Sequence, residues 1–114
     1  MAATVNLRID QGTTFSTDVT IWANTGDAFD LTGYTASAKM AQGYASTRTR
    51  TTFTTYIAND ATSGVVTLSL SATQTGALEA PARYVFDVEI LKQSDNTVTR
   101  VVEGIITVSP SVTI

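Results

Sequence analysis

The apolar residues of this chain recur with a period of two along most of its length, and this alternation limits the fold more than any other feature does. It is clearest in 84–91, where Tyr84, Phe86, Val88 and Ile90 fall on one face of an extended segment. An amphipathic helix needs a period of about 3.6 residues, and no such period persists beyond about two turns. The pattern therefore predicts an all-β protein.

Turn-forming residues separate the alternating segments. Asn24–Asp27, 59–64 and 94–97 are rich in Asn, Asp, Ser and Gly, which tolerate the backbone conformations of turns. The predicted strands between them are 4–9, 15–22, 34–41, 49–58, 65–70, 84–91 and 98–108. About seven short strands of this kind are typical of a two-layer antiparallel sandwich. With 114 residues the chain has room for one domain, 1–114.

One stretch breaks the period of two and narrows the fold. Ser71–Gln74 has the pattern of a capping box, in which two side chains satisfy free amides at a helix start. A strand, a short helix and a second strand opening with Tyr84 reproduce the E–F corner of immunoglobulin-like domains. Phe86 stands where such domains carry a cysteine, and the chain has none. We therefore predict an Ig-like antiparallel β-sandwich with one short helix at this corner and no disulfide.

Three further residues receive structural roles. Leu31 is a candidate plug into the core, and Gly33 is a bend before the strand 34–41. Gly104 interrupts the last strand, where it predicts a kink or a β-bulge. Phe86 is expected to fill the space between the sheets by packing. All of these roles concern architecture and none concerns reaction chemistry.

The charge distribution argues against nucleic acid as a partner. The net charge is −3, and the seven basic residues are scattered along the sequence. Phosphate binding needs a clustered basic face, and only Arg48 and Arg50 lie close together. We expect these two arginines either to lie exposed at the edge of a surface loop or to contact a partner protein. No signal peptide opens the chain and no run of 18 apolar residues could span a bilayer, so we predict no membrane partner.

Catalytic groups are sparse. The chain has no histidine and no cysteine, so the usual base of a nucleophilic triad is missing. Asp87 and Glu89 lie two residues apart on one strand face, and paired carboxylates are the raw material of glycoside hydrolysis. The alternative is a solvated strand face that answers Lys or Arg on a neighbouring strand. We favour the second interpretation and predict a non-enzymatic protein.

Acidic turns offer the only candidate metal ligands. Asp27 with Asp30, and Asn59 with Asp60, could supply oxygen atoms to a calcium ion. Neither pair follows the spacing of an EF-hand, and Asp and Asn are ordinary turn formers. The sequence therefore predicts no metal and no cofactor.

Three aromatic residues leave a second kind of function open. If Trp22, Tyr44 and Tyr56 were exposed together in one concave patch, their rings could stack on sugars. A glycan-binding adhesion module, recognising host glycan, is therefore the alternative function. The competing interpretation packs Trp22 into the core or between the sheets, and has Tyr44 anchor a loop.

Five segments, taken in order, carry a resemblance to a known family. They are DQGTTF at 10–15, FDLTGYTA at 29–36, GVVTLSL at 64–70, ARYVFDVEI at 82–90 and VTRVVEGIITVSP at 98–110. Together they resemble small virion structural proteins of tailed bacteriophages, above all those of phages that infect marine cyanobacteria. The chain is also similar, more loosely, to the Ig-like N-terminal domain of phage upper-baseplate proteins.

The resemblance implies a structural protein of a virion that is assembled in the host cytoplasm. A capsid decoration protein, a neck or tail connector and a baseplate subunit are the expected roles, and Asp30 is expected to cap its loop. Baseplate proteins of this kind continue into a long C-terminal portion, whereas the sequence ends at Ile114. This difference favours a decoration or connector subunit.

The expected partners are other virion proteins, including further copies of this chain in a homo-oligomer. Backbone pairing at a sheet edge and shape-complementary burial are the expected mechanism. The terminal segments 1–10 and 109–114 are apolar enough to add a strand to a neighbour. The candidate partner contacts are Val5, Leu7, Ile9, Arg48, Arg50, Val112 and Ile114.

Overall fold

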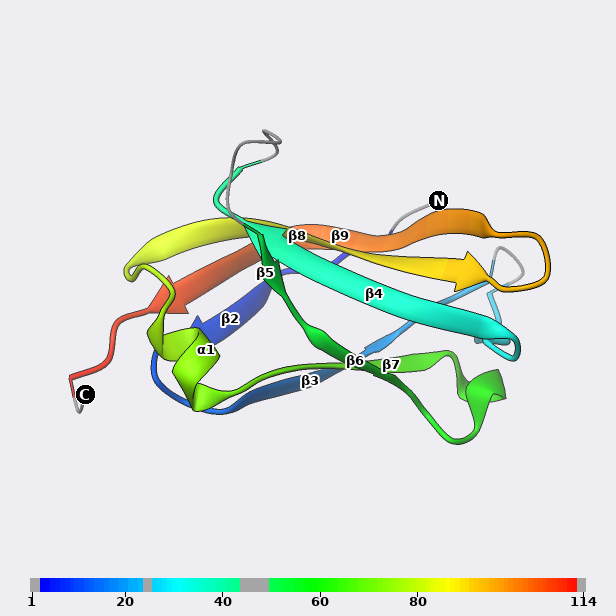
Figure 1. Cartoon of the computed structure of the whole chain (residues 1–114), viewed down its shortest axis with the longest axis horizontal. Coiled ribbons are helices and arrows are strands. Elements are labelled where there is room, and N and C mark those ends of the chain that lie inside the picture. The colour runs from blue at the N-terminus through cyan, green and yellow to red at the C-terminus, as the bar shows by residue number, and fades with distance from the viewer. Residues whose placement is uncertain (1–2, 24–25, 44–49, 113–114) are drawn as a thin grey trace.

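The computed structural model describes residues 3–23, 26–43 and 50–112, and in it the chain forms two packed β-sheets (Figure 1). The strands are β1 (Ala3–Thr4), β2 (Leu7–Asp10), β3 (Phe15–Thr20), β4 (Tyr34–Ala41), β5 (Thr51–Thr52), β6 (Thr54–Ile57), β7 (Val65–Leu70), β8 (Ala82–Lys92) and β9 (Thr97–Ser109). A 3-10 helix, η1 (Ala61–Ser63), precedes β7, and a short α-helix, α1 (Ala72–Gly76), follows it. The predicted all-β sandwich is confirmed.

The strand order is that of an Ig-like domain. The large sheet has the order β1–β9–β8–β4–β5, with β2 also paired to β9, and the small sheet has the order β3–β7–β6. In Ig nomenclature the small sheet corresponds to strands B, E and D, and β9, β8 and β4 correspond to G, F and C. The helix α1 joins β7 to β8 and therefore lies at the predicted E–F corner.

The N-terminal edge is the exception to the antiparallel pattern. Ala3 pairs with Val102 and Leu7 pairs with Ile106, and both registers are parallel to β9. The geometry follows from the path of the chain, because β2 passes directly into β3 of the other sheet instead of turning back in a hairpin. A turn with Gly12 at φ 81° makes this change of sheet.

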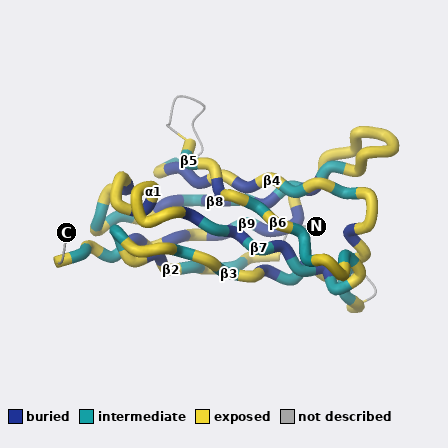
Figure 2. The backbone as a smooth tube through the Cα atoms, turned by 60° about the horizontal axis from the view of Figure 1, so that its bottom comes forward, coloured by how far each residue is buried: buried dark blue, intermediate teal, exposed yellow. Residues whose placement is uncertain are grey.

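The core lies between the two sheets, and Figure 2 shows the buried residues alternating with exposed ones along the strands. The four apolar residues of 84–91 that share a face are all buried, as predicted. Val66, Leu68 and Leu70 oppose them from the small sheet and are also buried. Leu31 is 1% exposed, so its predicted role as a plug is confirmed.

The predicted strand 49–58 is instead two strands in different sheets. Its first part, β5, pairs with β4 in the large sheet, and its second part, β6, pairs with β7 in the small sheet. Phe53 lies at the crossing, where its N–H donates to the Ala38 carbonyl at 3.0 Å. Its ring packs between Phe15, at a centroid distance of 6.2 Å, and Phe86, at 6.4 Å. Phe86 therefore fills the space between the sheets, as predicted.

The corner before β8 forms as the sequence predicts. The Ser71 hydroxyl accepts from the Gln74 N–H, and the Gln74 side chain accepts from the Ser71 N–H, which completes the capping box. The Tyr84 hydroxyl accepts a hydrogen bond from the Glu79 N–H at 2.8 Å. This bond fixes the segment between α1 and β8 against the start of β8.

The turn before β4 also confirms its prediction. The Asp30 carboxylate accepts a hydrogen bond from the Thr32 N–H at 3.0 Å, so Asp30 caps the loop. Hydrogen bonds from the side chain and backbone of Thr32 lower the pKa of Asp30. Gly33 has φ 81°, a left-handed conformation that suits a residue without Cβ, and it makes the bend into β4.

The bulge predicted at Gly104 lies elsewhere. The register between β8 and β9 shifts between Val88 and Glu89, so Val101 is the extra residue on β9. Gly104 itself pairs in regular register with Phe86. A Cβ atom at Gly104 would overlap the Val5 carbonyl oxygen. Gly104 is needed because the N-terminal segment lies against its backbone, not because the strand bends there.

Candidate functional site

Charged residues of both signs gather on the outer face of the large sheet, which points away from the small sheet. Side chains alternate across a strand, so the neighbours of the buried residues on β4, β8 and β9 point away from the small sheet. The strand register places these outward residues in rows across the sheet. The central row is Lys39, Asp87 and Glu103, and the next row is Ser37, Glu89 and Arg100.

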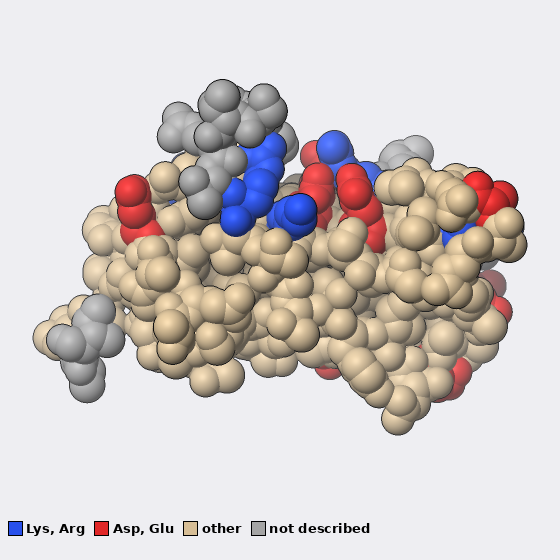
Figure 3. Space-filling view, in the orientation of Figure 1, with Lys and Arg blue, Asp and Glu red and all other residues tan. Residues whose placement is uncertain are grey.

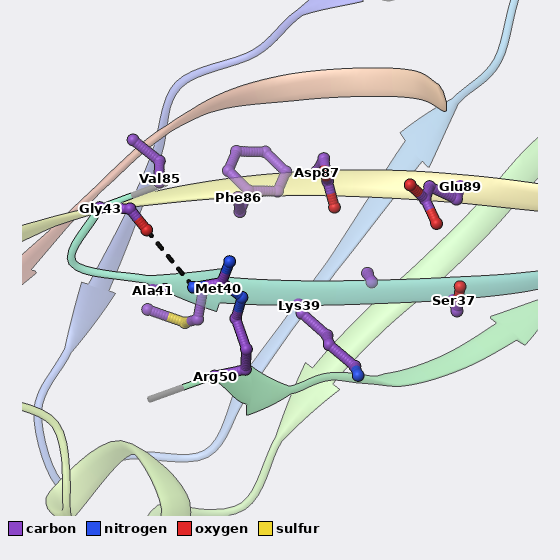
Figure 4. Close-up of a pocket in the computed structure, with 11 residues that line it drawn as sticks. Ser37, Lys39, Met40, Ala41, Gly43, Arg50, Val85, Phe86, Asp87 and Glu89 are labelled. Atoms are coloured by element: carbon purple, nitrogen blue, oxygen red, sulfur yellow. Dashed lines mark hydrogen bonds between the residues drawn. The ribbon is translucent and has the colours of Figure 1, made fainter. Parts of the chain in front are cut away.

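A hollow of about 340 Å³ opens on this face over β4 and β8 (Figure 4). Its charged lining consists of Lys39 on β4, Arg50, which directly precedes β5, and Asp87 and Glu89 on β8. The Arg50 guanidinium donates to the Gly43 carbonyl at 3.5 Å, which connects the two described ends of the loop after β4. The partner contact predicted at Arg50 therefore lies at the rim of the hollow.

Opposite charges lie side by side on this face (Figure 3). Lys39 belongs to β4, whereas Asp87 on β8 and Glu103 on β9 carry the acidic side. Arg100 lies 3.4 Å from the Asp87 carboxylate and 3.9 Å from that of Glu103. Asp87 therefore has the basic neighbour on an adjacent strand that the sequence analysis favours. Lys39 on β4 therefore lies directly across one strand boundary from Asp87 on β8, whereas Arg50 is one strand further away.

An apolar row borders the charged rows. The register aligns Ala41, Val85 and Ile105 across β4, β8 and β9. Ile105 is 42% exposed, Val85 is half-buried and Ala41 is buried. Protein–protein interfaces combine an apolar core with a polar rim, and this face has side chains of both kinds.

The predicted N-terminal contacts belong to the domain's own large sheet. Ile9 is fully buried in the core, and Val5 and Leu7 pack against it. Within the described residues β2 pairs with β9 alone, so its second backbone edge has no strand beside it. A partner contact through these three side chains stays a prediction, and it would require the segment to leave β9.

The C-terminal contacts are only partly described. Val112 is 99% exposed, whereas Ile114 and Arg48 lie outside the described residues. The start of the tail is held by Gln11, whose Oε1 accepts from the Ser111 N–H at 3.4 Å. The Nε2 of the same Gln11 donates to the Leu78 carbonyl at 2.9 Å. Sequence reasoning missed this residue, because its partners are distant in the chain.

Two of the three aromatic residues that the alternative glycan-binding function needs lie in the described part of the chain. Trp22 is 61% exposed, so the interpretation that packs it in the core is wrong. Tyr56 is 55% exposed on β6, while Trp22 follows β3, and β7 separates these two strands. Neither residue lines the hollow, and Tyr44 lies outside the described residues.

The acidic turns act as caps. The Asp60 carboxylate accepts from the Thr62 N–H at 3.2 Å and from its hydroxyl, which caps η1. Among the described residues, no three acidic side chains converge as metal ligands would. No helix in the described ranges is long and apolar enough to cross a membrane.

No model of a known protein family matches the chain, and no curated protein matches its sequence.

Proposed function

We propose that this domain is a non-enzymatic structural protein of a tailed-phage virion that works by binding other protein subunits. The observation that carries the proposal is the outer face of the large sheet. There a hollow lined by Lys39, Asp87 and Glu89 adjoins an apolar row that ends in the exposed Ile105. Accessible apolar area beside charges of both signs suits recognition of another protein surface.

The resemblance of five ordered segments to virion proteins supports the assignment to a particle. Three of them cover the turn before β4 with the start of that strand, most of β8 and most of β9, and β4, β8 and β9 are the strands that build the outer face. A capsid decoration protein, a neck or tail connector and a baseplate subunit are the roles in which this face would meet a neighbouring subunit.

Immunogold labelling of intact particles with an antibody raised against the domain tests the proposal. Regular labelling over the head would support a capsid decoration protein, and labelling confined to the neck or the tail end would support a connector or baseplate subunit. Pre-immune antibody on the same particles is the control. If both intact and gently disrupted particles remain unlabelled, the virion assignment is wrong.

A further inference from the structure

We propose that two copies of this chain bind each other through the outer faces of their large sheets. The two-fold axis would lie in the interface, parallel to the strands, between β4 and β8. This inference rests on the proposed function, because it names the protein surface that the outer face binds. It is carried by the cross-strand register of the charged rows.

The symmetry follows from simple geometry. Rotation by 180° about such an axis turns one face over onto the other and exchanges β4 with β8. Positions along the strands do not change, so each residue lies over the partner's copy of its own cross-strand neighbour. Because Lys39 pairs with Asp87 in the sheet, Lys39 lies over Asp87 of the partner subunit. An isologous interface makes this contact twice.

The neighbouring rows obey the same rule. Ala41 pairs with Val85 in the sheet, so the partner's half-buried Val85 lies over the backbone position of the buried Ala41, and no charged side chain opposes it there. The rotation also places β9 of one copy over β5 of the other. Glu103 shares a row with Thr52, so Glu103 lies over the partner's Thr52 and beside the partner's Arg50. Opposite charges in one row become complementary charges across the interface.

The packing would be that of one sheet on another, and the strand lengths set the size of the interface. The rotation keeps the strands of the two copies nearly aligned, as in sandwiches, whose sheets pack about 10 Å apart. Eight residues of β4 at about 3.3 Å each, across the three strands β4, β8 and β9 about 4.8 Å apart, give a flat footprint of roughly 400 Å², to which the two residues of β5 add little. Side chains enlarge the accessible area of such a footprint toward the roughly 800 Å² per partner of a standard interface.

Charge reversal and mixing test this inference on the full chain. We expect sedimentation velocity to find a dimer for the unchanged chain and monomers for Lys39→Glu and for Asp87→Lys. An equimolar mixture of the two variants is expected to dimerise again. In the mixed dimer, residues 39 and 87 carry opposite charges at both contacts. We expect each single reversal to raise the dimer Kd by at least about tenfold.

Controls separate the interface from folding. Asp18→Lys makes the same change on an exposed residue of β3 in the small sheet, and we expect it to leave the dimer intact. Thermal unfolding checks each variant, because Asp87→Lys also removes the bridge to Arg100. The unchanged chain gives a second measurement. Its dimer Kd is expected to rise at least tenfold between about 0.1 M and about 1 M ionic strength, where the screening length falls from about 10 Å to about 3 Å.

Each contrary result is decisive. The inference is wrong if the unchanged chain is a monomer at every concentration, if folded Lys39→Glu still dimerises as the unchanged chain does, or if the mixture of folded variants stays monomeric. A dimer insensitive to salt would also contradict it. The particle labelling is independent of this measurement. If virions are labelled but the purified chain is a monomer, only the dimer is wrong. If particles stay unlabelled but the mixed variants dimerise, only the virion assignment is wrong.

Discussion

The corner at Tyr84 and the N-terminal edge at Gly104 both attach a neighbouring segment to the two longest strands, β8 and β9. At the corner, the Tyr84 hydroxyl accepts from an N–H five residues earlier. At the edge, the backbone of Gly104 lies against Val5, almost the whole chain away. The contact made by the Tyr84 hydroxyl is one hydrogen bond, whereas the edge depends on a whole strand and the burial of Ile9.

This difference separates a local contact from a long-range one. The corner can form once α1 and the start of β8 are in place, because both partners belong to neighbouring residues. The edge needs β9 paired in its final register before the N-terminal segment finds its position. Loss of the edge should therefore cost more stability and involve more residues than loss of the corner bond.

The largest effect is expected for Gly104→Ala. The added Cβ overlaps the Val5 carbonyl oxygen, so either β1 and β2 leave β9 or the strand distorts. Exposure of the fully buried Ile9 together with lost strand pairing should lower the free energy of unfolding by about 3 kcal/mol or more. Urea denaturation measures the loss, and hydrogen exchange should locate it in residues 3–10.

Gly76→Ala is the matched control. The nearest atom to a Cβ at Gly76 is the Gly12 Cα at 3.8 Å, so an alanine fits at the end of α1, with an expected change below about 1 kcal/mol. A double-mutant cycle with Ile9→Ala sharpens the comparison. Because both changes release the same segment, the double variant should lose much less unfolding free energy than the two single variants lose together. Strict additivity would contradict the assignment of Gly104 to the N-terminal strand.

A smaller effect is expected for Tyr84→Phe at the corner. The change removes only the hydroxyl that accepts from the Glu79 N–H, which should cost about 1 kcal/mol in urea denaturation. Tyr56→Phe is the control, because that hydroxyl is exposed and bonded to the nearby Asn59 side chain. If the two variants lost equal stability, the corner bond would have no special role.

The features that sequence patterns predicted well depend on neighbours in the chain. The bond that the Tyr84 hydroxyl accepts, the cap at Asp30 and the bend at Gly33 each involve residues at most five positions apart in the chain. The alternation of buried residues follows from the strand alone, since successive side chains point to opposite faces. Such signals are complete within a short stretch of sequence.

The features that were missed depend on which strands become neighbours. The crossing of Phe53 between sheets, the bulge at Val101 and the role of Gly104 all require the final register. The site shows the same division. The alternation of side chains along β8 predicted that Asp87 and Glu89 share one face. Only the pairing of β4 with β8 brings Lys39 opposite Asp87.

The smallest effect concerns charge at local turns. Hydrogen bonds from Thr32 lower the pKa of Asp30, and hydrogen bonds from Thr97 lower that of Asp95. A carboxylate whose pKa is lower in the folded state stabilises the fold above its unfolded pKa, which is about 3.9, and loses this contribution as pH falls through the folded value. The urea midpoint should therefore drop on acidification from about pH 5 to about pH 3, and Asp30→Asn with Asp95→Asn should flatten that drop.

A matched variant distinguishes the donors at the first of these turns. Thr32→Val removes the hydroxyl, the larger cause of the lowered pKa of Asp30, while the backbone N–H that donates at 3.0 Å remains. We therefore expect it to remove part of the pH dependence contributed by Asp30, and Asp30→Asn to remove all of it. Equal slopes in the unchanged chain and in Asp30→Asn would show that geometry alone, without charge, holds this local turn. The loop before β4 would then resemble the corner at Tyr84, where a neutral hydroxyl makes the contact.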